Sequence, residues 1–407
     1  DRGRQVVDAF SATRDFSGGV AGSRSGEPVV EQAFGFADFA SQKRFEKDTS
    51  FHIASVSKTF TAAAIRELAD EGTLDLDDSL GKFVPDFPYA DQISIRQLLN
   101  HQSGVADYWS ADDVLEIASR QIDLDELVTW LGGRPLAYEP GTDSQYSNSG
   151  YALLAAAIER ASGQEYHAYL AERIYPRANL TATSAFESNT VAVGYQPSHD
   201  ALGIEPPTPY NPSLLTGSGS LKSTAPDLLR WCDSFVADFN NPETGSFLYG
   251  WGAREGGGHR WVEQSGRNPG FSAHVRGYPD DEMCLVVLSN IESESVGAIG
   301  AGIAEIAFGG APEAPALRPA PILSQEQQMP FVGTFEIEPG NNVRVRSHEG
   351  KLELRGQNGV FLPLEPIAED RFFFRQLYVE IGTKREADGS VVALLWGGSY
   401  PMARIDD

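Results

Sequence analysis

The stretch FHIASVSKTF (residues 51–60) places a serine three residues before a lysine. On a helix, residues at this spacing lie on one face about one turn apart, so Ser55 and Lys58 can touch if a helix begins at Ser55. A serine hydroxyl needs a base to take its proton, and a lysine acts as that base only when it is neutral, which burial or nearby cations favour. Apolar residues surround Lys58 in the sequence. The stretch therefore predicts a nucleophile with its base; the alternative is a helix-capping serine followed by a surface lysine.

The same spacing occurs again in SLGK, where Ser79 precedes Lys82. This copy has a glycine inside it, follows two aspartates and precedes FVPDFP, so it offers no sustained helical pattern. We expect a polar turn with a solvated lysine here. Since at most one copy can be an active site, other stretches must decide between them.

A second stretch of interest is YSN, in the segment EPGTDSQYSNSGYALLAAAIE. Tyr146 and Asn148 stand two residues apart in a predicted loop before a strong helix over 149–163, so both side chains can point into one cleft. Tyr146 can relay a proton between Ser55 and a leaving group, and Asn148 can donate to a substrate carbonyl. The alternative is a helix-capping loop with a packed tyrosine.

A third stretch, HRWVEQSGRNPGFSAHV, carries QSG on a predicted strand. Gly266 would let the backbone approach the cleft closely. A serine at a helix N-terminus has exposed backbone N–H groups beside it, which favour the oxyanion of acyl transfer. We expect the N–H of Arg267 to be a second oxyanion donor beside that of Ser55.

Composition limits the class of protein. The 407 residues fit two or three domains, and 41% hydrophobic residues suffice for packed cores. A net charge of -25 disfavours nucleic acid and anionic membranes as partners. The sequence has no apolar run of 18 residues, so we expect no membrane span.

The sequence opens at Asp1 without an export segment, which fits a removed signal peptide or a trimmed chain. We expect an exported protein, periplasmic or extracellular in a bacterium, without excluding the cytoplasm. No feature indicates an oligomeric state.

The cysteines and histidines give no metal-binding pattern. Cys232 lies in a predicted helix and Cys284 in a predicted buried strand, which favours two buried free thiols. We expect neither a metal nor a cofactor, because two distant cysteines with no histidine cluster make no zinc site. His52 and His101 are interpreted as packed or loop-fixing groups, and His167 as a solvated one.

The chain divides by pattern into three parts. Residues 1–310 begin with short runs that predict antiparallel strands over about the first 50 residues, and continue as helices and then strands. Residues 311–328 are rich in proline and alanine and read as a linker. Residues 329–407 carry short alternating runs separated by turns, which predict a small antiparallel β-barrel.

Together these stretches resemble the serine penicillin-binding protein and β-lactamase superfamily, on the branch of class C β-lactamases, D-aminopeptidases, DD-carboxypeptidases and related esterases. The resemblance spans most of residues 15–308 and includes ISIRQLLNHQSGV and SGSLKSTAPDLLRW in family order. It implies an α+β fold like that of β-lactamases and DD-peptidases: a five-stranded antiparallel sheet flanked by helices, and an all-helical lobe around residues 75–240. The C-terminal barrel, lipocalin-like, resembles those appended to relatives. Ser55 is then the nucleophile, Lys58 its base partner, Tyr146 and Asn148 the second motif, and Arg267 a backbone oxyanion donor.

The third motif departs from the family pattern. The family usually has Lys or His, a small residue and Gly, whereas this chain has Gln264, Ser265 and Gly266. In the family the cation assists the proton network and recognises a substrate carboxylate; a neutral glutamine can only hydrogen-bond. Arg267 or the pair His259-Arg260 are other sources of charge, unless they serve the surface.

The resemblance and the motifs favour a serine hydrolase that forms an acyl-enzyme on Ser55 with an amide or peptide, as D-amino-acid peptidases and DD-carboxypeptidases do. A carboxylesterase of the same fold is one alternative, because Gln264 removes the usual carboxylate anchor. A penicillin-binding or sensor protein that is acylated without turnover is another. A binding protein that has lost activity is disfavoured by the intact Ser55, Lys58 and Tyr146.

Overall fold

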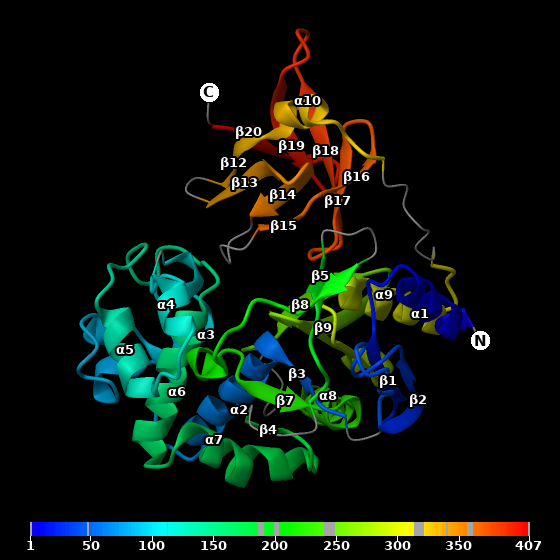
Figure 1. Ribbon diagram of the computed structural model, residues 1–407. Coiled ribbons are helices and arrows are strands. Elements are labelled where there is room, and N and C mark those ends of the chain that lie inside the picture. The colour runs from blue at the N-terminus through cyan, green and yellow to red at the C-terminus, as the bar shows by residue number, and fades with distance from the viewer. Residues whose placement is uncertain are drawn as a thin grey trace.

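The computed structural model describes residues 2–46, 49–111, 113–185, 191–198, 203–239, 249–312, 321–338, 341–355 and 361–405. Figure 1 shows two parts, a larger one built of helices and sheets and a smaller β-barrel. Among the described residues, none of the helices is both long enough and apolar enough to cross a bilayer.

A six-stranded antiparallel sheet forms the centre of the larger part, in the order β2-β1-β11-β10-β9-β8. Its strands are β1 (Gly18–Arg24), β2 (Glu27–Phe34), β8 (Gly252–Gly256), β9 (His259–Asn268), β10 (Phe271–Tyr278) and β11 (Met283–Ser289). All seven residues of β11 are buried, because helices cover both faces of the sheet. The sheet therefore has six strands where five were expected, and its edge strand β8 is mostly exposed.

Helices α1 (Arg2–Ala12) and α9 (Ser295–Ala307) pack together on one face of the sheet, and α8 (Ala225–Phe239) covers the other. The prediction of strands throughout the first 50 residues missed α1. Its buried Val6, Val7 and Phe10 recur at helical spacing, so the signal was present.

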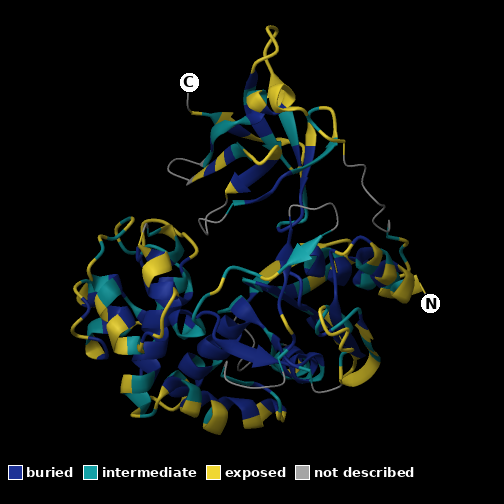
Figure 2. Ribbon diagram, in the orientation of Figure 1, coloured by how far each residue is buried: buried dark blue, intermediate teal, exposed yellow. Residues whose placement is uncertain are grey.

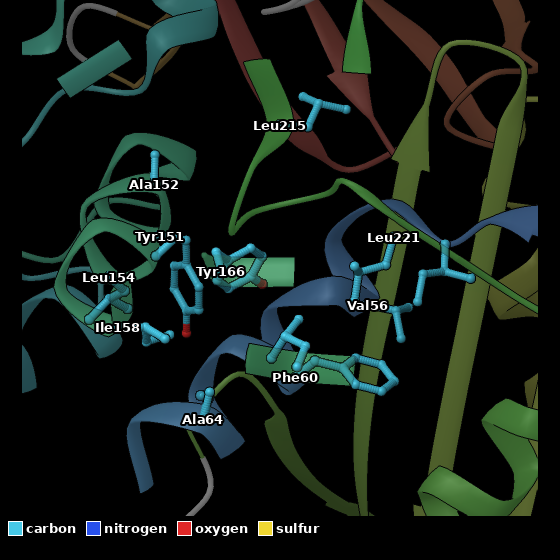
Figure 3. Close-up of a cluster of buried hydrophobic side chains, with 14 of the residues drawn as sticks. Val56, Phe60, Ala64, Tyr151, Ala152, Leu154, Ile158, Tyr166, Leu215 and Leu221 are labelled. Atoms are coloured by element: carbon cyan, nitrogen blue, oxygen red, sulfur yellow. The ribbon is translucent and has the colours of Figure 1, made fainter. Parts of the chain in front are cut away.

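The helical lobe packs against α2 (Ser57–Asp70). Figure 3 shows Phe60 and Ala64 of α2 in one cluster with Tyr151 of α6, and Figure 2 shows this centre as buried while the outer helices are exposed. The lobe contains α3 (Ile95–Leu99), α4 (Val114–Ala118), α5 (Leu124–Gly132), α6 (Asn148–Ser162) and α7 (Tyr166–Tyr169).

The predicted all-helical lobe over 75–240 was wrong in its second half. Among the described residues of this half, four short strands occur, and α8 packs on the central sheet instead of the lobe. The strands are β4 (Ser184–Ala185), β5 (Gln196–Pro197), β6 (Ile204–Glu205) and β7 (Leu221–Ser223), and β7 also pairs with β3 (Phe51–His52), directly before the serine–lysine motif.

The C-terminal barrel was predicted correctly. Nine antiparallel strands in the order β15-β14-β13-β12-β20-β19-β18-β17-β16 form a nearly closed barrel around phenylalanines such as Phe335 and Phe372. The strands are β12 (Gly333–Glu338), β13 (Asn341–His348), β14 (Lys351–Arg355), β15 (Phe361–Pro363), β16 (Glu365–Ala368), β17 (Arg371–Phe374), β18 (Val379–Arg385), β19 (Val391–Trp396) and β20 (Tyr400–Arg404).

Part of the predicted linker (311–328) lies outside the described residues, at 313–320. Its last four residues form α10 (Gln325–Gln328). The amide of Gln328 donates to the carbonyl of Gly350 at 2.6 Å and accepts from the Ser347 hydroxyl at 2.6 Å. This helix therefore belongs structurally with the barrel.

The prediction of two free thiols was wrong. Cys232 of α8 and Cys284 of β11 form a disulfide that ties the helix to the central sheet. Both sulfurs were expected to be buried, and both are. The pairing could not be predicted because 52 residues separate the cysteines along the chain, and only the packing of α8 on β11 brings them together.

Candidate active site

Ser55 lies in a 3-10 turn, Ala54–Val56, that leads directly into α2. The turn forces Ala54 into the left-handed region, with φ of 48°. A residue with a Cβ rarely adopts this conformation, and such strain concentrates at functional sites. The hydroxyl oxygen of Ser55 lies 3.1 Å from the Lys58 ammonium nitrogen, as the three-residue spacing predicted.

Lys58 is completely buried. Its Nζ donates to three acceptors: Ser55 Oγ, Asn148 Oδ1 at 2.7 Å and the carbonyl of Ser218 at 2.9 Å. Burial lowers the pKa of Lys58 to about 7, although the carboxylate of Asp107 acts in the opposite direction. A substantial fraction of this lysine is therefore neutral near neutral pH and available as a base.

The hydroxyl of Tyr146 donates to Ser55 Oγ at 2.8 Å, and the Lys58 ammonium nitrogen lies 4.8 Å from the centre of the tyrosine ring. Half of the residue's surface is exposed, but desolvation of the hydroxyl raises the pKa of Tyr146 above its usual range. The phenol is therefore protonated at neutral pH and is placed to pass a proton to a group bound at Ser55.

Asn148 is held from two sides. Its Oδ1 accepts from Lys58, while its Nδ2 donates to Asp107 at 2.7 Å and its backbone N–H donates to the same carboxylate at 3.1 Å. The side chain thus orients Lys58, while the expected contact with a substrate carbonyl stays a prediction. Burial raises the pKa of Asp107. Neither Asp107 nor Ser218 was predicted to belong to the site; Ser218 begins the stretch SGSLKSTAPDLLRW, whereas Asp107 lies two residues beyond ISIRQLLNHQSGV.

The histidines support the site without being placed to react at Ser55. His101 Nδ1 accepts from the N–H of Ser147 at 3.2 Å, and its ring packs on Tyr146; burial lowers the pKa of His101 to about 4, so it is neutral. His52 packs on Phe271, and burial lowers its pKa to about 3. The interpretation of these two as packed or loop-fixing groups is confirmed: His52 is packed, and His101 fixes the loop at Ser147.

The expectation for His167 was wrong. Its Nε2 lies 2.9 Å from the hydroxyl of Ser220, and the side chain is only 23% exposed. This histidine is therefore anchored to the segment before β7, whereas a solvated side chain was predicted.

Strand β9 lies directly against the serine turn. The side-chain amide of Gln264 donates to the Ser55 carbonyl at 3.2 Å. At Gly266, a Cβ would stand 2.4 Å from the Ile53 carbonyl oxygen and 2.7 Å from the Ser55 nitrogen, so only glycine fits. Ser265 is on the opposite face of the strand, 2.8 Å from His274 Nδ1. The structure thus brings Gln264 and Gly266 to the serine, but not Ser265.

Arg267 directs its guanidinium group to two carboxylates. Its Nε lies 3.7 Å from Glu292 and its Nη1 3.7 Å from Glu294. Its backbone N–H follows Gly266 and remains the candidate for the second oxyanion donor. The other basic residues of β9 are also paired, His259 with Asp281 and Arg260 with Asp280.

The second S-x-x-K copy is a turn, as predicted. Ser79 accepts from the N–H of Gly81 at 3.0 Å and so caps a short 3-10 helix, Leu80–Lys82. Lys82 forms an ion pair with Asp78 at 2.7 Å, and its side chain is 53% exposed. This lysine is therefore exposed to solvent, unlike Lys58.

Residues 4–308 match the family model described as Beta-lactamase. The chain belongs to this family. Penicillin-binding protein 4* of Bacillus subtilis (strain 168) is 31% identical over 418 residues, which cover 92% of each protein. The likeness to this relative therefore extends beyond the residues that the family model matches.

Solved structures share the fold of this family member. The octameric penicillin-binding protein homologue from Pyrococcus abyssi has a TM-score of 0.65 and 21% identity over 98% of both chains. D-amino acid amidase from Ochrobactrum anthropi SV3, complexed with L-phenylalanine amide, has a TM-score of 0.66 and 21% identity over 75% of this chain and 99% of its own.

A first prediction concerns the pH dependence of acylation. The neutral form of Lys58 increases as pH rises through about 7, so the acylation rate should rise about tenfold per unit below this pH and level off above it. Asp107→Asn removes a negative charge that raises the pKa of Lys58. We therefore expect this variant to move the rise to lower pH, measured as kcat/KM against pH.

Asp77→Asn serves as the matched control, because Asp77 pairs with Arg96 and its side chain is 70% exposed. Its profile should coincide with that of the unchanged protein. A rise in the Asp107→Asn profile that stays in place, or moves to higher pH, would contradict the assigned base.

Proposed function

We propose that this protein is a serine hydrolase that forms an acyl-enzyme on Ser55 with amide or peptide substrates. The proposal depends on one observation: Ser55 Oγ lies within 2.8 Å of the Tyr146 hydroxyl and 3.1 Å of the Lys58 nitrogen. A nucleophile, a proton relay and a base of lowered pKa thus meet at one atom.

The proposed reaction begins with attack of Ser55 Oγ on the substrate carbonyl carbon, while neutral Lys58 accepts the hydroxyl proton. The backbone N–H groups of Ser55 and Arg267 would bind the resulting oxyanion. Tyr146 then gives its proton to the leaving nitrogen and regains one from Lys58, and the C–N bond breaks. Water then attacks the carbonyl carbon of the acyl-enzyme, while Lys58 and Tyr146 take a proton from the water. The bond to Ser55 Oγ breaks, Ser55 regains its proton, and the acid is released.

The surroundings of Gln264 support substrates without a carboxylate next to the scissile bond. Gln264 is neutral and donates to the Ser55 carbonyl, and the Arg267 guanidinium faces two glutamates. A substrate carboxylate would therefore meet no free cation from either side chain. This favours the amide of an amino acid, including a D-amino acid, over a peptide with a free C-terminus. It also favours a carboxylic ester, which is the second candidate.

We also propose that the protein is exported. The disulfide between Cys232 and Cys284 supports this proposal, because such bonds persist in oxidising compartments and are rare in the cytosol of mesophiles.

The nucleophile assignment is tested with Ser55→Ala, and with Ser79→Ala as its matched control. Incubation with a p-nitrophenyl ester, a D-amino-acid p-nitroanilide and a fluorescent penicillin measures turnover and covalent labelling. We expect Ser55→Ala to lose turnover by a factor on the order of 10³–10⁶, and Ser79→Ala to match the unchanged protein.

Turnover that survives in Ser55→Ala would refute the assignment. Stable penicillin labelling of the unchanged protein without turnover of any substrate would instead support the non-hydrolytic penicillin-binding protein. Cleavage of the ester alone would support the carboxylesterase.

The role of Gln264 in selectivity gives a third prediction. Family members usually have Lys or His at the position of Gln264, and this cation recognises a substrate carboxylate. Gln264→Lys would restore such a cation. A charge-assisted hydrogen bond contributes about 1.5–3 kcal/mol, so penicillin acylation should become roughly ten- to a hundredfold faster. Hydrolysis of a neutral p-nitrophenyl ester serves as the reference, because it should not gain. An equal change for both substrates would show that Gln264 does not govern carboxylate recognition.

A further inference from the structure

The barrel contacts the larger part through the turn between β17 and β18, residues 375–378, which points toward that part in Figure 1. Arg375 is 1% exposed although it is charged. Its three guanidinium nitrogens donate to the Asp15 carboxylate at 2.9 Å and to the carbonyls of Gly203 at 2.9 Å and Arg14 at 2.7 Å. A guanidinium group satisfied on all sides fixes the turn in place.

The next residue of the turn, Gln376, is 4% exposed and bonds to the segment before α9. Its Nε2 donates to Glu292 Oε1. Its carbonyl accepts from the N–H of Glu294 at 2.9 Å, and the carbonyl of Arg375 accepts from the Ser293 hydroxyl at 3.0 Å. Consecutive residues 292–294 are thus each bonded to the barrel turn.

Glu292 connects this turn to the strand beside the nucleophile. The carboxylate is 3% exposed; its Oε2 accepts from the N–H of Gly270 at 3.1 Å, and its Oε1 lies 3.7 Å from Arg267 Nε. Gly270 is in the turn between β9 and β10, and Arg267 follows Gly266, whose backbone touches the serine turn. The barrel therefore reaches Arg267, the candidate oxyanion donor, through two contacts: Gln376 with Glu292, and Glu292 with Arg267.

We propose that Gln376 of the barrel is a positioning residue for acylation, which holds Glu292 and through it the end of β9 that carries Arg267. This inference rests on the proposed function, since it concerns the oxyanion of that reaction. Arg375 and Gln376 have separate tasks: Arg375 docks the barrel, and Gln376 supplies the hydrogen bond that a buried carboxylate needs. Without this bond Glu292 is left short of a donor, and its contacts with Gly270 and Arg267 shift.

The test is Gln376→Met in the full chain, which keeps the length of the side chain and removes its donor. Because small displacements of a donor cost large factors in rate, we expect the acylation rate by a p-nitrophenyl ester to fall roughly tenfold or more, with little change in KM. The matched control is Gln325→Met, at an exposed position on α10, which should leave the rate unchanged.

A second measurement does not need catalysis. Hydrogen exchange at the Gly270 amide should be faster in Gln376→Met, since the Glu292 carboxylate that accepts the hydrogen bond from this amide is no longer held. In the background of Glu292→Gln, Gln376→Met should add little further loss of rate, because both changes act on one bond. A merely structural role would lower stability without this selective loss of rate.

An acylation rate within twofold of the unchanged protein would overturn the proposal, as would independent, additive effects of Gln376→Met and Glu292→Gln. If the unchanged protein were not acylated at all, the proposed function would fail. In that case hydrogen exchange would still test the contact between Gln376 and Glu292, and an unaltered exchange rate at Gly270 in Gln376→Met would overturn it. Should Gln376→Met not fold, Gln376→Asn, which keeps the amide but shortens the side chain, takes its place with the same outcomes.

Discussion

The burial of the Lys58 ammonium group is the constraint on which the rest of the site depends. A buried amine is costly unless each of its protons has an acceptor, and here Ser55, Asn148 and the Ser218 carbonyl supply them. These three acceptors come from three separate segments of the chain. The same burial lowers the pKa of Lys58 to about 7, so it also favours the neutral form that the proposed base requires.

The serine side of the site depends on close backbone packing. Gly266 leaves no space for a side chain between β9 and the serine turn, and Ala54 holds a strained backbone conformation before Ser55. Such strain persists only where the surrounding structure enforces it. Here the enclosing elements are β9 and the buried end of α2, and the barrel reaches the same strand through Gln376 and Glu292.

Local sequence patterns predicted the features that depend on local geometry. The spacing of Ser55 and Lys58, the helix after Asn148 and the glycine at 266 each express a rule about neighbouring residues, and the structure shows all three. The barrel was predictable for the same reason, because short alternating runs specify strands one at a time.

Contacts between distant residues were not predictable in this way. Asp107 stands 41 residues before the asparagine that it holds, and Arg375 bonds to a carboxylate 360 residues away. The cysteine pair and the side of β9 on which Ser265 lies also depend on tertiary packing. Composition and spacing say which residue types are present, but only the packed fold determines which of them meet.

The most direct test of this account is the pKa of Lys58 itself. The sequence has only seven lysines, so ¹³C NMR of protein labelled at lysine Cε can follow each one through a pH titration, with Lys58→Arg to assign the signal. The account predicts that the Lys58 signal titrates near pH 7. Titration of this signal near the ordinary lysine value of about 10.4 would contradict it.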